Sequence, residues 1–236
     1  MQDVIDTQVT TVPHSVDTRF TDDYRLPRTD QKTPTTRFLI LADGRSSFAR
    51  KNLIGSVKAY LQAFPRRAVQ RLTLKTRNAD EHSDAAQKVR VLIEARDDIE
   101  WIDDTLSESE LTRLLAAHDV IISLHRAEGY GLHLAEAMSL GKVVVATNWS
   151  GNTEFMNADN SILVPSKLIE ATDTANVYTS EDNVSWADPD IAYAAEELVK
   201  LHNAPDRRRM IGNKARAAML AFTGRSHYSR FLSQRD

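Results

Sequence analysis

The strongest constraint on the fold of this chain is a regular alternation of short apolar runs and longer amphipathic patterns. The runs are continuous, as expected for strands that are covered on both faces of a sheet. They lie at residues 38–41, 72–74, 120–122 and 143–145, with weaker candidates at 99–102 and 162–164. Helical patterns lie between and after them, at 53–64, 107–115, 132–140, 191–202 and 206–221. This alternation predicts an α/β, Rossmann-like domain: a mainly parallel sheet with helices on both faces.

The domain is expected to occupy residues 36–222, because the periodic patterns begin and end there. Residues 1–35 carry three prolines and no sustained periodicity, so they are expected to form an extended lead-in or interdomain segment, and 223–236 a C-terminal tail. A chain of 236 residues is long enough for one substantial domain and short for two.

Composition excludes several classes of function. A net charge of -3 argues against general nucleic-acid binding, which needs a basic excess. The chain has no cysteine, so disulfides, thiolate metal sites and cysteine nucleophiles are excluded. No apolar stretch approaches the ~18 residues of a membrane span, and residues 1–10 are too polar for a secretory signal. We therefore predict a cytoplasmic protein, and peripheral attachment to the inner membrane stays open.

The most informative stretch runs from a predicted strand through a glycine-rich turn into a predicted helix. Gly129, Tyr130 and Gly131 form the turn, where a ligand can approach the backbone and the helix N-terminus can bind an anion. Glu128 precedes the turn. Glu136 lies within the helix, between leucines at i−4 and i+4, and a carboxylate on such a face needs a hydrogen-bonding partner such as a sugar hydroxyl. The alternative is an ordinary strand-to-helix turn with one solvated and one paired glutamate.

A basic loop follows the first predicted strand. It contains Gly44, Arg45, Arg50, Lys51 and Asn52, just before a predicted helix. Cations at a helix start are unfavourable for the helix dipole, and a bound diphosphate would explain them. The alternative is an exposed basic loop.

His125 and an Asp-Pro-Asp segment each allow two interpretations. His125 flanks the Glu128 turn, where a contact with a sugar and simple packing are equally reasonable. Asp188-Pro189-Asp190 matches the D-x-D pattern of metal-dependent glycosyltransferases, but it directly precedes a predicted helix, which favours an N-cap Asp and a proline at the first helical position. No histidine pair has metal-binding spacing with a carboxylate, so we predict no metal and no other cofactor.

These motifs resemble those of the family 4 retaining glycosyltransferases. The segment from Glu128 to Glu136 resembles the family's E-x7-E motif, and residues 44–52 resemble its G-R-x-x-x-x-R-K-[NG] element. Residues 147–155 resemble the G-G-x-x-E loop, with Ser-Gly-Asn in place of the glycine pair, and residues 13–17 resemble the P-N-G-V-D segment that joins two domains.

The resemblance implies the C-terminal, donor-binding half of a glycosyltransferase-B fold. Arg45 and Lys51 would hold the diphosphate of a UDP- or GDP-sugar, and with Glu128, on the sugar hydroxyls, they are the candidate catalytic residues. Glu136 would bind the ribose. The remaining candidate donor-binding residues are Gly44, Asn52, His125, Gly129, Tyr130, Gly131 and Leu132. Retention of anomeric configuration and metal independence are likewise implied by the resemblance.

The chain departs from the family pattern in two places. An acceptor-binding domain normally precedes the P-N-G-V-D segment, whereas only a short lead-in does so here, so we expect an excised domain or a separate N-terminal acceptor-domain partner. His133 stands where relatives often carry proline. The expected function is sugar transfer to a glycan or lipid-linked saccharide acceptor. The alternatives are a non-catalytic nucleotide-sugar-binding subunit, a sugar-nucleotide epimerase or hydrolase, and a plain α/β interaction domain.

Overall fold

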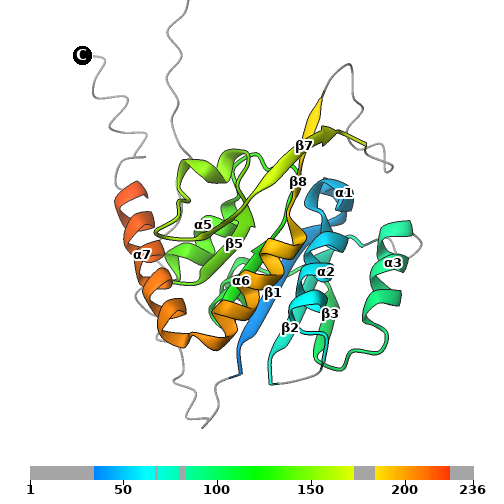
Figure 1. The fold of residues 1–236 in the computed structure, drawn as a ribbon, viewed down its shortest axis with the longest axis horizontal. Helices are drawn as coiled ribbons and strands as arrows, with labels where there is room; N and C mark the ends of the chain where they lie inside the picture. Colours follow the sequence, from blue (N-terminus) through cyan, green and yellow to red (C-terminus); the bar gives the residue numbers. More distant parts are fainter. Residues whose placement is uncertain (1–34, 67–68, 80–82, 173–183, 224–236) are drawn as a thin grey trace, which may run out of the picture.

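The computed structural model describes residues 35–66, 69–79, 83–172 and 184–223. Its centre is a six-stranded parallel sheet in the order β3-β2-β1-β4-β5-β6 (Figure 1). The strands are β1 (Arg37–Asp43), β2 (Arg71–Arg77), β3 (Ile99–Asp103), β4 (Val120–Ser123), β5 (Val143–Thr147) and β6 (Ile162–Val164). The expected Rossmann-like sheet is thereby confirmed. The lead-in and tail lie almost wholly outside the described residues, as does the segment 13–17.

Helices cover both faces of the sheet. They are α1 (Phe48–Lys51), α2 (Leu53–Ala63), α3 (Asp84–Ile93), α4 (Glu108–Ala116), α5 (Leu132–Ser139), α6 (Ile191–Asn203) and α7 (Pro205–Thr223). Helices α2, α3 and α6 contribute to one hydrophobic core, and α4, α5 and α7 to the other. None of the described helices is both long and apolar enough to cross a membrane.

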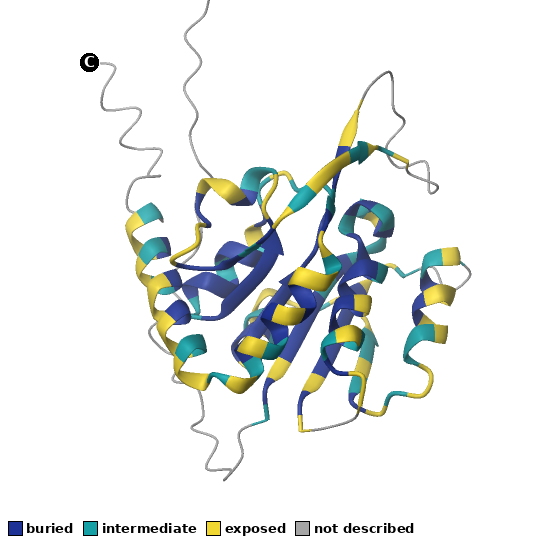
Figure 2. Cartoon of the chain, viewed as in Figure 1, coloured by how far each residue is buried: buried dark blue, intermediate teal, exposed yellow. Residues whose placement is uncertain are grey.

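Strand β1 shows why the sequence builds two cores. Phe38 and Ile40 are buried in the core beneath α2, whereas Leu39 is buried in the opposite one. Successive side chains of a strand point to opposite faces, so a continuous apolar run fits only a strand that is covered on both sides. Figure 2 shows the resulting buried sheet between partly exposed helices.

Helix ends follow the expected capping chemistry. Ser107 and Glu110 form the capping box of α4. Asp190 caps α6 by accepting from the N–H of Tyr193 at 2.9 Å. The expectation for Pro189 was wrong in position: it ends a strand and precedes the cap, so Ile191 is the first helical residue.

Two features were not predicted. Helix α3 was missed, and so was an antiparallel hairpin of β7 (Ser166–Glu170) and β8 (Ser185–Pro189), which projects from the sheet in Figure 1. Both hairpin strands are short and rich in polar residues, and β7 has no buried residue, so they carry none of the continuous apolar character that marks the central strands.

The strand order positions the functional site. Strands β1 and β4 are neighbours although two strands and four α-helices separate them in the sequence. Their connections leave in opposite directions across the sheet, and ligands of such folds bind in the crevice outside the carboxyl ends of these strands. The loops after β1 and β4 are the basic loop and the Glu128 turn, so the topology brings the two motifs together.

Candidate functional site

Hydrogen bonds in both directions join the basic loop to the Glu128 turn. The N–H of Arg126 donates to the carbonyl of Arg50 at 2.8 Å, and the Arg50 guanidinium donates to the carbonyl of Ala127 at 2.5 Å. Arg50 also donates through Nε to the carbonyl of Ser46 at 3.1 Å, and only 9% of the residue is exposed. Arg50 therefore clamps the loops from within. It was recognised only as a motif position, because its partners lie 77 residues away in the sequence.

The clamp sets Lys51 beside Glu128. Lys51 Nζ forms an ion pair with Glu128 Oε2, and the side chains are only 11% and 12% exposed. Burial by itself raises the pKa of Glu128, but the charge and hydrogen bond of Lys51 hold it below its usual value. Glu128 is therefore an anion at neutral pH. The structure thus brings together the cation predicted for a diphosphate and the carboxylate predicted for a sugar.

A third loop supports the Glu128 turn. The N–H of Glu128 donates to Ser150 Oγ at 3.2 Å, and the N–H of Gly151 donates to the carbonyl of Glu128 at 3.1 Å. This loop leads into the short 3-10 helix Gly151–Glu154 after β5. It contains the Ser-Gly-Asn segment that stands in place of the family's glycine pair, and its glycine lies directly against the turn.

We expect Gly151→Ala to destabilise the chain by about 1–3 kcal/mol, the usual cost of an overpacked site. A Cβ at this position would lie 2.0 Å from the carbonyl oxygen of Gly129, and both sides of the contact are backbone. Gly129→Ala is the matched control, because a Cβ there meets nothing within 4 Å. Urea denaturation of both variants measures the difference. Equal stability of the two would contradict the close packing of the third loop on the turn.

Helix α5 begins at the turn with no side-chain cap. Its N-cap is Gly131 at φ 89°, a left-handed conformation that favours glycine. Because no described side chain caps this helix, its first amides are available to another acceptor, and the partial positive charge of the N-terminus favours an anion. Gly129 and Leu132 lie on either side of this N-terminus and are exposed.

The expectation for the surroundings of Glu136 was wrong. Leu132 is 40% exposed and Glu136 is half-buried, so they lie on the outer side of α5, whereas Leu140 after the helix packs against the second core. The buried side consists of Leu134, Ala135, Ala137 and Met138. Leucines at i±4 indicate a shared face but not which way that face points. A ribose contact at Glu136 stays a prediction that does not depend on an apolar environment.

His125 is turned into the protein. Its Nε2 lies 3.1 Å from both the Trp149 carbonyl and Asn152 Oδ1, so it donates to them, and Nδ1 accepts from the Ser123 hydroxyl at 3.0 Å. The residue is fully buried, and burial lowers its pKa. Both ring nitrogens thus tie β4 to the third loop. The contact with a sugar stays a prediction, and packing is the role that these bonds indicate.

The other candidate residues lie around the site in different ways. Arg45 is exposed on the 3-10 turn Gly44–Ser46. Gly44 allows a close approach to the end of β2, since a Cβ there would lie 2.1 Å from the Asn78 carbonyl oxygen. Asn52 caps α2 by accepting from the N–H of Gly55. The Tyr130 ring packs on Phe155 at 5.2 Å.

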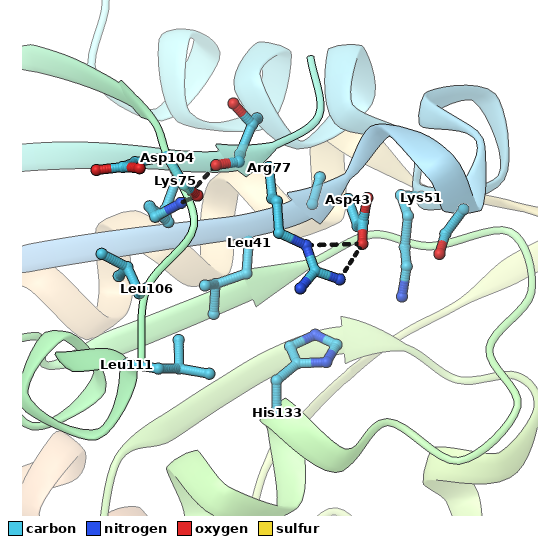
Figure 3. Close-up of a pocket in the computed structure, with 12 residues that line it drawn as sticks. Leu41, Asp43, Lys51, Lys75, Arg77, Asp104, Leu106, Leu111 and His133 are labelled. Carbon is cyan, nitrogen blue, oxygen red and sulfur yellow. Dashed lines mark hydrogen bonds and ion pairs between the residues drawn. The ribbon is translucent and has the colours of Figure 1, made fainter. Parts of the chain in front are cut away.

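A cavity of about 280 Å³ opens beside the loops, at the carboxyl ends of β1 and β2 (Figure 3). We call it the switch-point pocket. One end is lined by Leu106, Leu111 and Lys75, and the other by Asp43, Lys51 and His133. Gly44 and Asn52 instead line a separate hollow of about 710 Å³. Sequence reasoning missed the pocket residues of β2, which form a Lys-Thr-Arg run at the carboxyl end of the strand.

Three cations, Lys51, Lys75 and Arg77, line the pocket together with two aspartates, Asp43 and Asp104. The Lys75 ammonium donates to the carbonyls of Thr76 and Asp104, and Arg77 pairs with Asp43. Burial lowers the pKa of Lys75. Among the described residues no three His, Asp or Glu side chains gather in a way that could hold a metal ion. The pocket therefore offers cations and apolar surface to a ligand that is itself partly anionic and partly flat or apolar.

Solved structures of similar fold include glycosyltransferases. A glycosyltransferase from Rickettsia africae superposes with a TM-score of 0.63 at 18% identity, over 89% of this chain and 52% of that one. The C-terminal domain of a group 1 glycosyl transferase from Francisella tularensis gives 0.61 at 19% identity, over 88% and 97%. HepE of Anabaena, in complex with UDP-glucose, gives 0.59 at 17% identity, over 84% and 49%. The chain thus spans about half the length of the Rickettsia and Anabaena proteins.

Sequence comparison assigns the family. No curated protein matches the chain. The family model described as "Glycosyl transferases group 1" matches residues 30–178, which is more than half of the 236 residues. This range includes both motif loops, the supporting third loop and the switch-point pocket. The match and the sheet topology agree: the chain belongs to the group 1 glycosyltransferases and has the fold of their C-terminal, glycosyltransferase-B domain.

Proposed function

We propose that this chain is the donor-binding domain of a retaining, metal-independent hexosyltransferase. The donor is a UDP- or GDP-sugar, and the acceptor is a glycan or a lipid-linked saccharide. The observation that carries the proposal is the convergence of Lys51 and Glu128 at the switch point, beside an uncapped helix N-terminus. Support for a uridine nucleotide comes from the Anabaena protein of the same fold, which was solved with UDP-glucose.

In the proposed reaction the bond between the anomeric carbon and the β-phosphate oxygen breaks, and the acceptor oxygen bonds to that carbon. The nucleoside diphosphate leaves with the electron pair and takes up the acceptor proton. Lys51, Arg45 and the amides of residues 129–132 stabilise the developing negative charge. Such preorganised groups act where charge appears in the transition state, so no metal is required for this step.

Glu128 has a second role in the proposal. A diphosphate beside Lys51 competes with Glu128 for the ammonium group, and the carboxylate then accepts hydrogen bonds from sugar hydroxyls. Glu136, on the outer side of α5, binds the ribose. The two glutamates would thus recognise different parts of the donor.

Conservative variants test this division. Glu136→Gln should weaken binding of the bare nucleoside diphosphate and of the intact sugar donor to the same extent. Glu128→Gln should lower affinity or turnover for the sugar donor and should not weaken binding of the bare nucleotide, because the variant no longer competes with the diphosphate for Lys51. Each loss should be about 1–3 kcal/mol, as expected for a hydrogen bond to a charged group. Calorimetric titration with UDP, GDP and their sugar conjugates measures both. Equal weakening of the bare nucleotide and the conjugate by Glu128→Gln would refute the division.

A non-catalytic binding subunit is the second candidate, because the chain spans about half the length of the Rickettsia and Anabaena proteins. In that case an N-terminal, acceptor-binding partner supplies the other side of the cleft and any contact with the inner membrane. Co-purification of the tagged chain, followed by a transfer assay with and without the partner, separates the two. Efficient transfer by these 236 residues alone would exclude the binding-subunit reading.

A further inference from the structure

His133 lines the switch-point pocket from the first turn of α5. Its ring shares that end of the cavity with Lys51 and Asp43, and Figure 3 shows it rising from the helix toward the Arg77 guanidinium. The motifs that resemble the family's assign no role to this position.

One nitrogen of the ring has no partner. His133 Nε2 is buried, and it forms no hydrogen bond with any of the described residues. Buried polar atoms are almost always hydrogen-bonded, because an unmet donor or acceptor loses its water without compensation. An orphaned nitrogen at the wall of a cavity indicates that its partner is a molecule that enters the cavity.

The ring is neutral. Burial, followed by the positive charge of Lys51, lowers the pKa of His133 to about 3, although the charge of Glu128 acts in the opposite direction. A neutral imidazole carries one N–H donor and one acceptor nitrogen. With the proton on Nε2, the ring offers one hydrogen bond to the pocket and adds no charge to it.

The surroundings of Nε2 favour a negatively charged acceptor. Lys51 lies at the same end of the pocket, and the uncapped N-terminus of α5 supplies backbone amides beside it. Resting on the donor-binding role proposed above, we propose that His133 Nε2–H donates a hydrogen bond to a diphosphate oxygen of the bound nucleoside diphosphate. It would thus be a further donor-binding residue.

Two substitutions test the contact by calorimetry with UDP, GDP, uridine and guanosine. His133→Met keeps the bulk and removes the donor, so it should bind the nucleoside diphosphate about tenfold more weakly. His133→Gln places an amide N–H at similar reach and should bind within about threefold of the parent. Neither change should alter affinity for the nucleoside. Unchanged diphosphate affinity in His133→Met, or an equal loss for the nucleoside, would overturn the proposal.

Thermal unfolding without nucleotide gives a second readout. His133→Met removes an unsatisfied buried nitrogen and should raise the unfolding midpoint even as it weakens binding. His118→Met is the matched control: His118 bonds the Leu114 carbonyl at 2.6 Å and the Thr73 hydroxyl at 2.9 Å, away from the pocket. It should lower the midpoint and leave nucleotide affinity unchanged. A lowered midpoint in His133→Met would contradict the orphaned state of Nε2. Failure of the parent itself to bind UDP or GDP would refute the donor-binding role instead.

Discussion

Lys51→Ala is expected to destabilise the chain by roughly 3 kcal/mol and to weaken nucleoside-diphosphate binding by at least ~1.5 kcal/mol. The first effect arises because Glu128 is only 12% exposed and would lose its counter-ion. The second follows from the proposed contact with the diphosphate. Urea denaturation and calorimetry with UDP and GDP measure the two effects separately.

Two controls separate stability from binding. Adding Glu128→Gln to Lys51→Ala should recover much of the lost stability, because no buried charge is left unpaired, and should not recover diphosphate affinity. Arg45→Ala should lower the free energy of unfolding by less than about 0.5 kcal/mol, because Arg45 is exposed. It should still weaken binding of the nucleoside diphosphate. Lys51→Ala with parental stability would show that the ion pair contributes nothing to folding. If Lys51→Ala and Arg45→Ala both bound UDP and GDP as tightly as the parent, the proposed contact of these cations with the diphosphate would be refuted.

Mild acid is expected to destabilise the chain through its buried histidines. Burial lowers the pKa of His118, His125 and His133 in the folded state, while the unfolded chain keeps the ordinary value near 6.5. Between pH 6.5 and 3 the unfolded state therefore binds more protons, and stability falls as pH falls. For His133, with a folded pKa of about 3, the loss is about 2 kcal/mol at pH 5 and about 3 kcal/mol at pH 4.

The measurement is urea denaturation at pH 7.5, 6, 5 and 4. Carboxylates such as Asp98 and Glu128, whose pKa values are lowered in the folded chain, add to the loss mainly below pH 4.5. His133→Met shares these groups and lacks the imidazole, so the difference between the two profiles isolates His133. Parallel profiles for the parent and His133→Met would show that this ring titrates normally in the folded chain.

Local patterns were enough to predict the central sheet. Val120 to Ser123 and Val143 to Thr147 are buried at every position, and a continuous apolar run is the direct sequence mark of such a strand. Helix α3 was missed because it buries only Ala86 and Val89, too few residues for a clear periodicity.

Contacts between residues far apart in the sequence limited how much of the site could be predicted. Both motif loops were found from the sequence, but the Arg50 bond to Ala127 and the support from Ser150 depend on segments that only the folded sheet brings together. The orientation of Glu136 could not be predicted, because α5 meets α7 at a distance of some 70 residues in the chain, and that packing decides which side of α5 is inward.

The clamp formed by Arg50 has a consequence for the order of events when a donor arrives. Because the basic loop and the Glu128 turn are joined by one backbone hydrogen bond and by the Arg50 guanidinium, neither loop has to become ordered around the ligand. Little conformational entropy is then lost on binding, and the rearrangement is confined to the side chains of Lys51 and Glu128. Side-chain rotations are much faster than loop closure, so this half of the site should be ready before any larger domain motion begins.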